Sequence, residues 1–185
     1  MEFQGHSCQS PEERDKLVRE KIAKEDEMEA QATGDSRLIA RELLEKLGYA
    51  DKEIEVDTTF EVSSGKHSGL CSTDYIVRLD GRRYMAVKCS MALESRERHI
   101  LSFCRSVDSL AIPIAVITDG LTAHVLDTFS GKRIQEGMDN VPGRDAAMAY
   151  LRDNPDMTYP PDKAEKERRV LLAFETTLCP RPEDK

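Results

Sequence analysis

The sequence contains no tryptophan, and aromatic residues make up only 5% of its 185 residues. It also lacks any long uncharged apolar run, so no segment is expected to span a membrane. The first residues have neither a basic start nor an apolar stretch, so no secretory signal is expected. Lys and Arg number 27 against 35 Asp and Glu, which gives a net charge of −8. This balance excludes a generally basic protein that coats nucleic acid, although a local basic site is compatible with it.

The cysteines are also few, odd in number and widely spaced, and no two form a Cys-x-x-Cys pair (Cys8, Cys71, Cys89, Cys104, Cys179). A disulfide framework normally uses an even count in a short secreted chain. We therefore expect a reduced, cytoplasmic protein whose cysteines are small buried hydrophobic residues. A cysteine-ligated metal such as an iron–sulfur cluster is the alternative.

The amino-terminal part is predicted to be helical and highly charged. A helix beginning at Pro11 and ending near Ala32 has only a thin apolar stripe, which predicts an arm lying on the domain or on a partner. Thr33–Ser36 is expected to break this helix and cap a second one. That second helix has an apolar stripe expected to face a core (Leu38, Ile39, Leu43, Leu44, Leu47) and ends at Gly48.

Beyond Gly48 the apolar period changes from helical to alternating. The near-alternation from Ile54 to Val62 predicts one strand, and the polar stretch Ser63–Gly69 predicts a loop. Two further strands, over 74–79 and 83–89, flank Asp80-Gly81, which is typical of a hairpin.

The register of this hairpin decides which side chains share a face. A three-residue loop pairs Arg78 with Arg82 and Asp74 with Ala86, and we favour it over a two-residue turn. It places one apolar set on one side of the sheet (Tyr75, Val77, Leu79, Met85, Val87, Cys89). The other face is then expected to be largely polar, as in a half-buried sheet.

The remaining elements complete an α/β arrangement. A helix from Glu94 to about Asp108 is followed by the apolar run Ile112–Ile117, which predicts a central strand covered on both faces. A hairpin over 123–134 and two helical stretches near 144–152 and 162–176 come after it. We predict a mixed sheet flanked by helices. The expected divisions are a charged helical arm (1–34), an α/β core (35–137) and a helical carboxy-terminal extension (138–185).

Several short motifs follow one another in a characteristic order through residues 38–128. They are Leu47-Gly48-Tyr49, Ser72–Val77, Ala86-Val87-Lys88, Ile114–Gly120 and Val125-Leu126-Asp127. In this order the sequence resembles the amino-terminal nuclease domain of type I restriction enzyme R subunits, a branch of the PD-(D/E)xK nuclease superfamily. The resemblance implies a restriction-endonuclease-like fold and a metal-dependent site for cleaving DNA.

The resemblance also implies which residues form that site. Asp74, at the start of a strand, and Lys88, on the next, stand at the positions of the catalytic aspartate and lysine. In such a site carboxylates hold Mg²⁺, which activates a water molecule and stabilises charge on the phosphate. The acid of the acid-x-Lys pair is replaced by Ala86, which cannot bind metal. Cleavage is therefore expected to be impaired.

Other acids are candidates to replace the missing carboxylate. Glu61, at the end of the first predicted strand, and Glu42, on the second predicted helix, are the candidate metal ligands beside Asp74. Glu94 and Glu97, at the start of the following helix, are candidates for an acid that has migrated. A solvated or salt-bridged role is the simpler interpretation of each.

The basic residues around this site point to DNA. Residues 61–110 contain eight Lys and Arg and six Asp and Glu, a net charge of +2, whereas the rest of the chain carries −10. The candidate DNA-binding side chains are four arginines expected on the surface (Arg82, Arg96, Arg98, Arg105). An ordinary surface of mixed sign is the alternative interpretation.

Two functions follow from these observations. The first is a nuclease-like, DNA-associated protein with impaired metal-dependent cleavage. The second is a catalytically inactive scaffold that keeps the nuclease fold and binds a protein partner, or a second copy of itself, through the helical arm. The missing acid favours the second function, and the retained Asp74 and Lys88 favour the first.

Overall fold

The computed structural model describes residues 11–178, which begin with one long helix, α1 (Pro11–Lys46). The predicted break at Thr33–Ser36 is wrong. Ser36 Oγ lies 2.8 Å from the carbonyl oxygen of Ala32, one turn back in the same helix, and 2.6 Å from that of Asp119. The loop at Gly120 approaches so closely that a Cβ there would lie 3.2 Å from Ser36 Cα. Ser36 therefore attaches a continuing helix to the body instead of starting a new one.

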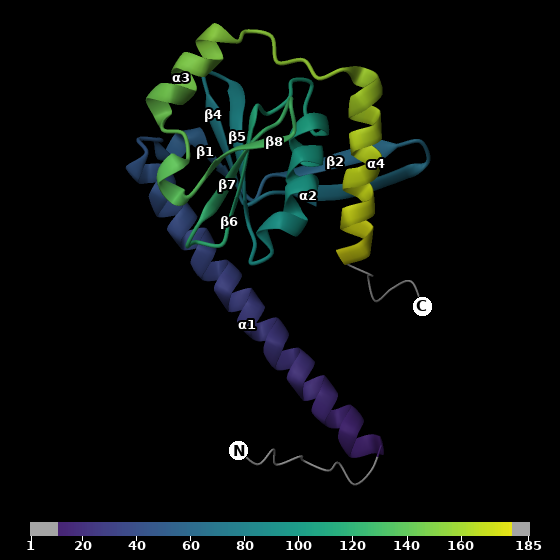
Figure 1. Cartoon of the computed structure of the whole chain (residues 1–185). Coiled ribbons are helices and arrows are strands. Elements are labelled where there is room, and N and C mark those ends of the chain that lie inside the picture. The colour runs from purple at the N-terminus through teal and green to yellow at the C-terminus, as the bar shows by residue number, and fades with distance from the viewer. Residues whose placement is uncertain (1–10, 179–185) are drawn as a thin grey trace.

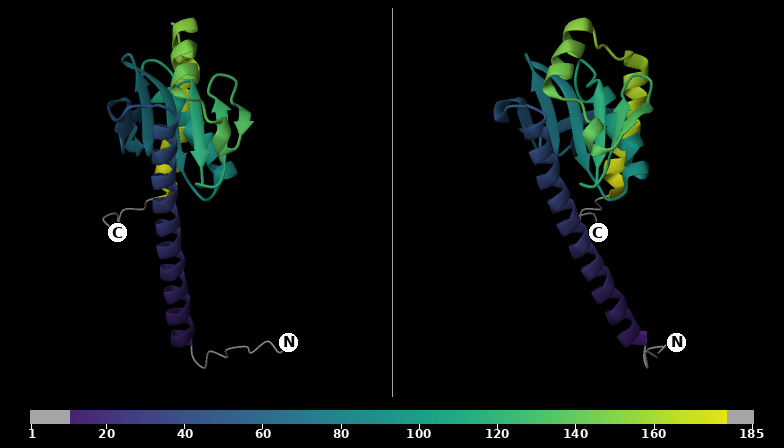
Figure 2. Two further views of the ribbon diagram at one scale, coloured as in Figure 1. Left: turned by 90° about the vertical axis from the view of Figure 1, so that its left-hand side faces the viewer. Right: turned by 60° about the vertical axis from the view of Figure 1, so that its left-hand side comes forward.

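Only the second half of α1 packs against the body. Its buried side chains follow a single i, i+4 line through Ser36, Ala40 and Leu44. Leu38 and Ile39, predicted to face the core, are 66% and 42% exposed. The first half projects away from the body (Figures 1 and 2). The helix ends at Gly48 as predicted, in the left-handed conformation with φ +89°.

A six-stranded mixed sheet forms the centre of the body, in the order β1-β4-β5-β6-β7-β8. Its strands are β1 (Ile54–Val56), β4 (Tyr75–Leu79), β5 (Arg82–Cys89), β6 (Ile114–Thr118), β7 (Ala123–Asp127) and β8 (Lys132–Glu136). Only β5 and β6 are parallel, and helix α2 (Leu93–Ser106) connects them. The predicted central strand is confirmed, because every residue of β6 is buried. The predicted α2 helix and β7–β8 hairpin are also confirmed.

The segment predicted as one strand and a polar loop instead forms parts of two sheets. The chain leaves β1 at Asp57, whose φ is +48°, and then forms a hairpin of β2 (Thr59–Ser64) and β3 (His67–Ser72). A two-residue turn at Gly65-Lys66 joins these strands, and Gly65 takes a positive φ of 61°. The predicted loop over Ser63–Gly69 is therefore wrong, because those polar residues pair as strands.

The predicted register of the β4–β5 hairpin is also wrong. Asp80 and Gly81 both have positive φ and form a two-residue turn, so Leu79 pairs with Arg82. A bulge near Val77 then shifts the ladder, so that Ile76 pairs with Ala86. Beyond the bulge the register differs from the predicted one by two residues, so the side chains there keep their predicted faces. Between the turn and the bulge it differs by one residue, and Tyr84, predicted on the opposite face, joins the apolar core cluster. The apolar set from Tyr75 to Cys89 accordingly lies together in one core cluster.

Helices cover both faces of the sheet, so the expectation of a largely polar face is wrong. The second half of α1 and helix α3 (Arg144–Asp153) contribute to the core on one face. Helices α2 and α4 (Pro161–Leu178) cover the other, together with the β2–β3 hairpin. Ile76 and Ala86 on this second face are fully buried. The helices predicted near 144–152 and 162–176 are thus present and pack against the body.

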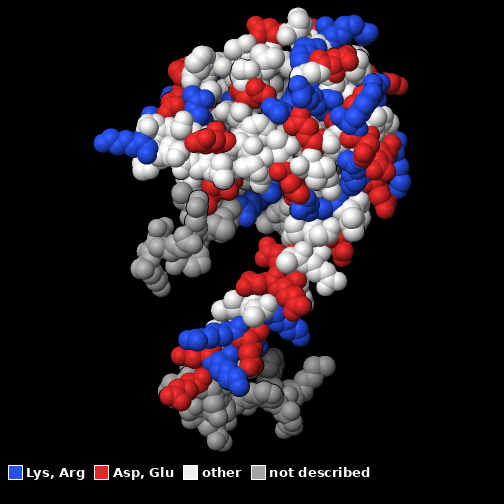
Figure 3. All heavy atoms as spheres, turned by 180° about the vertical axis from the view of Figure 1, so that it is seen from behind, with Lys and Arg blue, Asp and Glu red and all other residues white. Residues whose placement is uncertain are grey.

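The surface carries charges of both signs. On the face turned away from the viewer in Figure 1, acidic and basic side chains are interspersed over the body and along α1 (Figure 3). Within residues 11–178, no helix is both long and apolar enough to cross a membrane. Cys71, Cys89 and Cys104 are buried free thiols, while Cys8 and Cys179 lie outside the described residues. Burial raises the pKa of each of these three thiols to about 12.

Candidate functional site

The structure brings Asp74 and Lys88 together. Asp74 directly precedes β4 and is 6% exposed, and Lys88 lies near the end of β5, the neighbouring strand. Lys88 Nζ is 3.5 Å from Asp74 Oδ2, and the lysine side chain is 27% exposed. The antiparallel pairing of β4 with β5 positions these two side chains as an ion pair at one end of the sheet.

Asp74 has two further partners that involve both of its carboxylate oxygens. The backbone N–H of Cys89 donates to Oδ2 at 2.7 Å, and Nε of Arg37, on α1, lies 3.3 Å from Oδ1. Arg37 is held in place because the hydroxyl of Tyr75 donates to its carbonyl oxygen at 2.9 Å. A hydrogen bond to Asp57, with the nearby Asp74 charge, raises the pKa of Arg37 above its ordinary value. The negative charge of Asp74 is therefore balanced by two cations of the protein itself, Arg37 and Lys88.

A hollow of about 250 Å³ opens beside this ion pair. It is lined from several elements by Glu29, Thr33, Ser72, Asp74, Lys88, Cys89, Ser90, Arg96, His99 and Glu175. Glu29 and Thr33 belong to α1, so the continuous helix forms one wall of the hollow. Ala86, two residues before Lys88, is fully buried in the core and contributes no polar group.

The other predicted acids do not join Asp74 in this hollow. Glu42 and Glu61 are both exposed, and Glu42 pairs with Lys46 along α1 at 3.7 Å. Glu94 is 86% exposed, and Glu97 pairs with His124 at 2.8 Å and with Arg133 at 2.6 Å. Across residues 11–178, no three His, Cys, Asp or Glu side chains form a group that could hold a metal ion.

These residues do not fit a Mg²⁺ centre. A magnesium ion needs several oxygen ligands in near-octahedral geometry. Asp74 already accepts from the Cys89 amide and faces the charges of Arg37 and Lys88, and Ala86 supplies no second carboxylate. No catalytic step through a metal is therefore derived for this hollow.

Three of the four candidate DNA-binding arginines make contacts within the protein. Arg82 donates to the carbonyl oxygens of Leu151, Asn154 and Pro155 at the end of α3. Arg105, expected on the surface, is only 10% exposed, which corrects that prediction. It pairs with Glu167 at 3.0 Å and donates to the Thr128 carbonyl at 2.7 Å.

The remaining two arginines differ in how free they are. Arg98 pairs with Glu167 at 2.6 Å while its side chain is 46% exposed. Arg96 lines the hollow and forms no hydrogen bond or ion pair within the described part of the chain. Arg96 is therefore the candidate that the structure places beside Asp74 and Lys88.

The sequence analysis missed a histidine–glutamate pair in the same hollow. His99 Nε2, on α2, lies 3.0 Å from Glu175 Oε1, on α4, and the His99 ring is 5.2 Å from that of Phe174. His99 Nδ1 is buried and has no hydrogen-bond partner among residues 11–178. No spacing motif links residues 76 positions apart, so only the packing of α4 on α2 reveals this pair. A second histidine, His124 on β7, is 5% exposed and hydrogen-bonded to Glu97.

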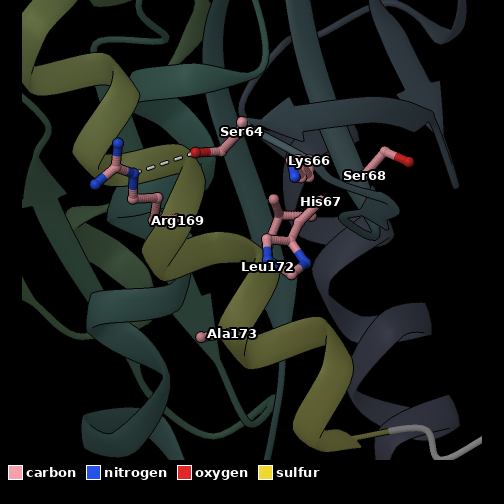
Figure 4. A pocket seen from close by; sticks show the side chains of 8 residues that line it. Ser64, Lys66, His67, Ser68, Arg169, Leu172 and Ala173 are labelled. Carbon is pink, nitrogen blue, oxygen red and sulfur yellow. Dashed lines mark hydrogen bonds between the residues drawn. The ribbon is translucent and has the colours of Figure 1, made fainter.

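A second, larger hollow lies between the tip of the β2–β3 hairpin and α4 (Figure 4). Its volume is about 570 Å³, and it is lined by Ser64, Gly65, Lys66, His67, Ser68, Arg169, Leu172 and Ala173. Ser64 Oγ donates to Glu165 at 2.6 Å and accepts from Arg169 Nε at 3.3 Å. We call this second hollow the hairpin groove.

The architecture defines an α/β protein with a mixed sheet covered by helices on both faces. Comparison with known families gives a match over residues 37–142 to the family described as type I restriction enzyme R protein N terminus (HSDR_N). The match includes more than half of the chain, so the protein belongs to this family. No curated protein and no solved structure matches the chain. The matched residues include β1 to β8 and α2, and leave out most of α1 and all of α3 and α4.

Proposed function

We propose that this protein is a DNA-associated member of its family in which metal-dependent phosphodiester cleavage is impaired. One observation supports the impairment. Asp74, which the family resemblance makes a metal ligand, is instead paired with Arg37 and Lys88, and the position of the second acid holds the buried methyl group of Ala86. A carboxylate with two cations nearby has little remaining capacity for a divalent ion, because like charges repel.

DNA association is supported by family membership and by Arg96, which lies beside Lys88 and forms no hydrogen bond or ion pair with the residues from 11 to 178. The test measures binding of the full chain to a labelled duplex by fluorescence anisotropy, with EDTA and with Mn²⁺. We expect binding that needs no metal and weakens steeply with salt, together with no cleavage under either condition. Robust cleavage by the wild type that survives Lys88→Ala would overturn the assignment of the site.

A designed variant tests the role of the missing acid. Ala86→Glu restores a carboxylate beside Asp74, and Ala115→Glu is its matched control, since Ala115 is equally buried and pairs with Ala86 across β5 and β6. Both substitutions bury a charge and should lower thermal stability. Only Ala86→Glu should then regain stability, and some cleavage, when Mn²⁺ is added. Equal responses of the two variants to Mn²⁺ would show that the missing acid at position 86 does not explain the impaired cleavage.

The second candidate function is an inactive scaffold that binds a protein through α1. Exposed apolar side chains on its projecting half favour it, since Val18, Ile22 and Met28 are each about half exposed. Sedimentation velocity of the wild type and Ile22→Asp tests self-association, and a larger species present only in the wild type would support it. The three buried free thiols are consistent with a reducing, cytoplasmic location, which we also propose.

A further inference from the structure

The hairpin groove differs in charge from the hollow beside Asp74. Of its eight described lining residues none is acidic, whereas Lys66 and Arg169 are cationic. The hollow beside Asp74 has three acids in its lining, Glu29, Asp74 and Glu175. An anionic ligand is therefore attracted to the groove more strongly than to the hollow.

The cations of the groove are held so that their charged ends face solvent. Arg169 Nε donates to the Ser64 hydroxyl at 3.3 Å and lies 3.7 Å from Glu165 Oε1, while the arginine side chain is 70% exposed. Glu165 is shared among several partners, because it also accepts hydrogen bonds from Ser64 and Arg168, and these hydrogen bonds lower its pKa. Lys66 lies at the tip of the hairpin, is exposed, and forms no ion pair within residues 11–178. Figure 4 shows Ser64, Lys66 and Arg169 around the groove.

The groove and the hollow beside Asp74 lie along one seam between β3 and α4. On β3, His67 and Ser68 line the groove and Ser72 lines the hollow. On α4, Arg169 lines the groove and Glu175 lines the hollow. Ser72 comes five residues after His67 along β3, a length of about 17 Å at the usual rise of a strand.

We propose that the hairpin groove binds the sugar–phosphate backbone of DNA, with Lys66 and Arg169 contacting phosphates and the strand continuing along the seam toward Arg96. Small and apolar groups at Gly65 and Leu172 form part of the groove and suit the carbon face of deoxyribose. The seam length of about 17 Å corresponds to roughly five base-pair steps measured along the axis of a duplex. This inference rests on the proposed DNA association and names the surface responsible for it.

The test compares two double variants of the full chain that remove the same charge. Lys66→Gln/Arg169→Gln neutralises the groove. Lys132→Gln/Arg152→Gln neutralises two exposed cations on β8 and α3. Binding to one labelled duplex is measured by fluorescence anisotropy over a series of salt concentrations, and circular dichroism checks the fold of each variant.

We expect the groove variant to bind DNA roughly 10- to 100-fold more weakly at low salt, with the slope of log K against log salt reduced by about 1.8. The control should stay close to the wild type in both measures. Lys66→Gln alone, at the exposed hairpin tip, should lower the slope by about 0.9 even if Arg169→Gln disturbs α4. Equal losses of DNA affinity in the two double variants, or no loss in either, would overturn the proposal that the hairpin groove binds DNA. The proposed DNA association of the protein would still stand. A wild type that does not bind DNA would overturn both proposals.

Discussion

Two buried carboxylates, Asp74 and Glu167, have nearly the same environment, although the family resemblance makes only Asp74 a candidate catalytic residue. Each residue is 6% exposed. Each faces two cationic side chains and accepts one further hydrogen bond. For Asp74 the partners are Arg37, Lys88 and the Cys89 amide, and for Glu167 they are Arg98, Arg105 and the Ser102 hydroxyl.

Glu167 has a purely structural position, because it lies on α4 and links that helix to α2. Asp74 has the same arrangement of partners and links α1 to β4 and β5. A metal site would gather several carboxylates, whose mutual repulsion costs stability until the ion binds. The likeness between the two residues indicates that Asp74 stabilises the fold in this protein. The two differ in their most buried cation: beside Glu167, Arg105 is 10% exposed while Arg98 is 46% exposed, whereas beside Asp74 Arg37 and Lys88 are 32% and 27% exposed.

The largest expected effect is that of removing the charge of Glu167. Glu167→Gln leaves the buried Arg105 guanidinium without a counter-charge, so the free energy of unfolding should fall by about 3 kcal/mol. Urea denaturation followed by circular dichroism measures it. A loss smaller than that caused by Asp74→Asn would contradict this expectation. It would mean that leaving the buried Arg105 without a counter-charge costs less than leaving Arg37 and Lys88 without one.

The same residue predicts a dependence on pH. Burial tends to raise the pKa of Glu167, but hydrogen bonds from Arg98 and Ser102 and the charges of Arg98 and Arg105 outweigh burial, so the pKa lies below its ordinary value of 4.5. A carboxylate with a lowered pKa stabilises the fold above the unfolded value and loses that contribution as pH falls through the folded one. The stability gap between wild type and Glu167→Gln should therefore be constant above about pH 5 and narrow below 4.5. Denaturant titrations at a series of pH values measure this difference in the free energy of unfolding. A difference that grows as the pH falls would show that the pKa of Glu167 is not lowered in the folded protein.

Asp74→Asn distinguishes a structural role from a catalytic one. The asparagine oxygen can still accept from the Cys89 amide, and Arg37 keeps its pair with Asp57, so a loss of about 1–2 kcal/mol is expected. If Asp74 belonged to a strained metal site, its neutralisation would stabilise the protein instead. Thermal unfolding of Asp74→Asn beside the wild type therefore decides by the sign of the change in Tm.

The sequence was sufficient to predict the elements whose apolar periodicity is strong, namely α2, β6 and the β7–β8 hairpin. It failed at Ser36, because a serine hydroxyl serves equally well as a helix cap and as a donor to the preceding helical turn. It failed again after β1, because the positive φ of Asp57 starts a separate hairpin and has no marker such as glycine. In both places the backbone conformation depends on contacts with residues that are distant in the sequence, so the local sequence does not predict it.

The candidate site could be predicted only in part for a similar reason. Asp74 and Lys88 lie on adjacent strands, so their order along the chain was enough to place them together. Arg37 reaches Asp74 only because α1 continues through Ser36. Arg98 and Arg105 turn to Glu167, more than 60 residues away, so nothing in their local sequence shows that they are engaged.

The smallest expected effect concerns Lys88 and tests which partner holds Asp74. Lys88→Met keeps most of the length of the side chain and removes its charge, while Arg37 and the Cys89 amide still satisfy the carboxylate. Because the ammonium lies at 3.5 Å and is partly solvated, we expect a loss below about 1 kcal/mol in urea denaturation. A double-mutant cycle with Asp74→Asn should give a coupling of about 0.5 kcal/mol. A coupling as large as the whole effect of Asp74→Asn would make Lys88 the main partner of Asp74. The two carboxylates would then differ, because the charge of Glu167 is shared between two arginines.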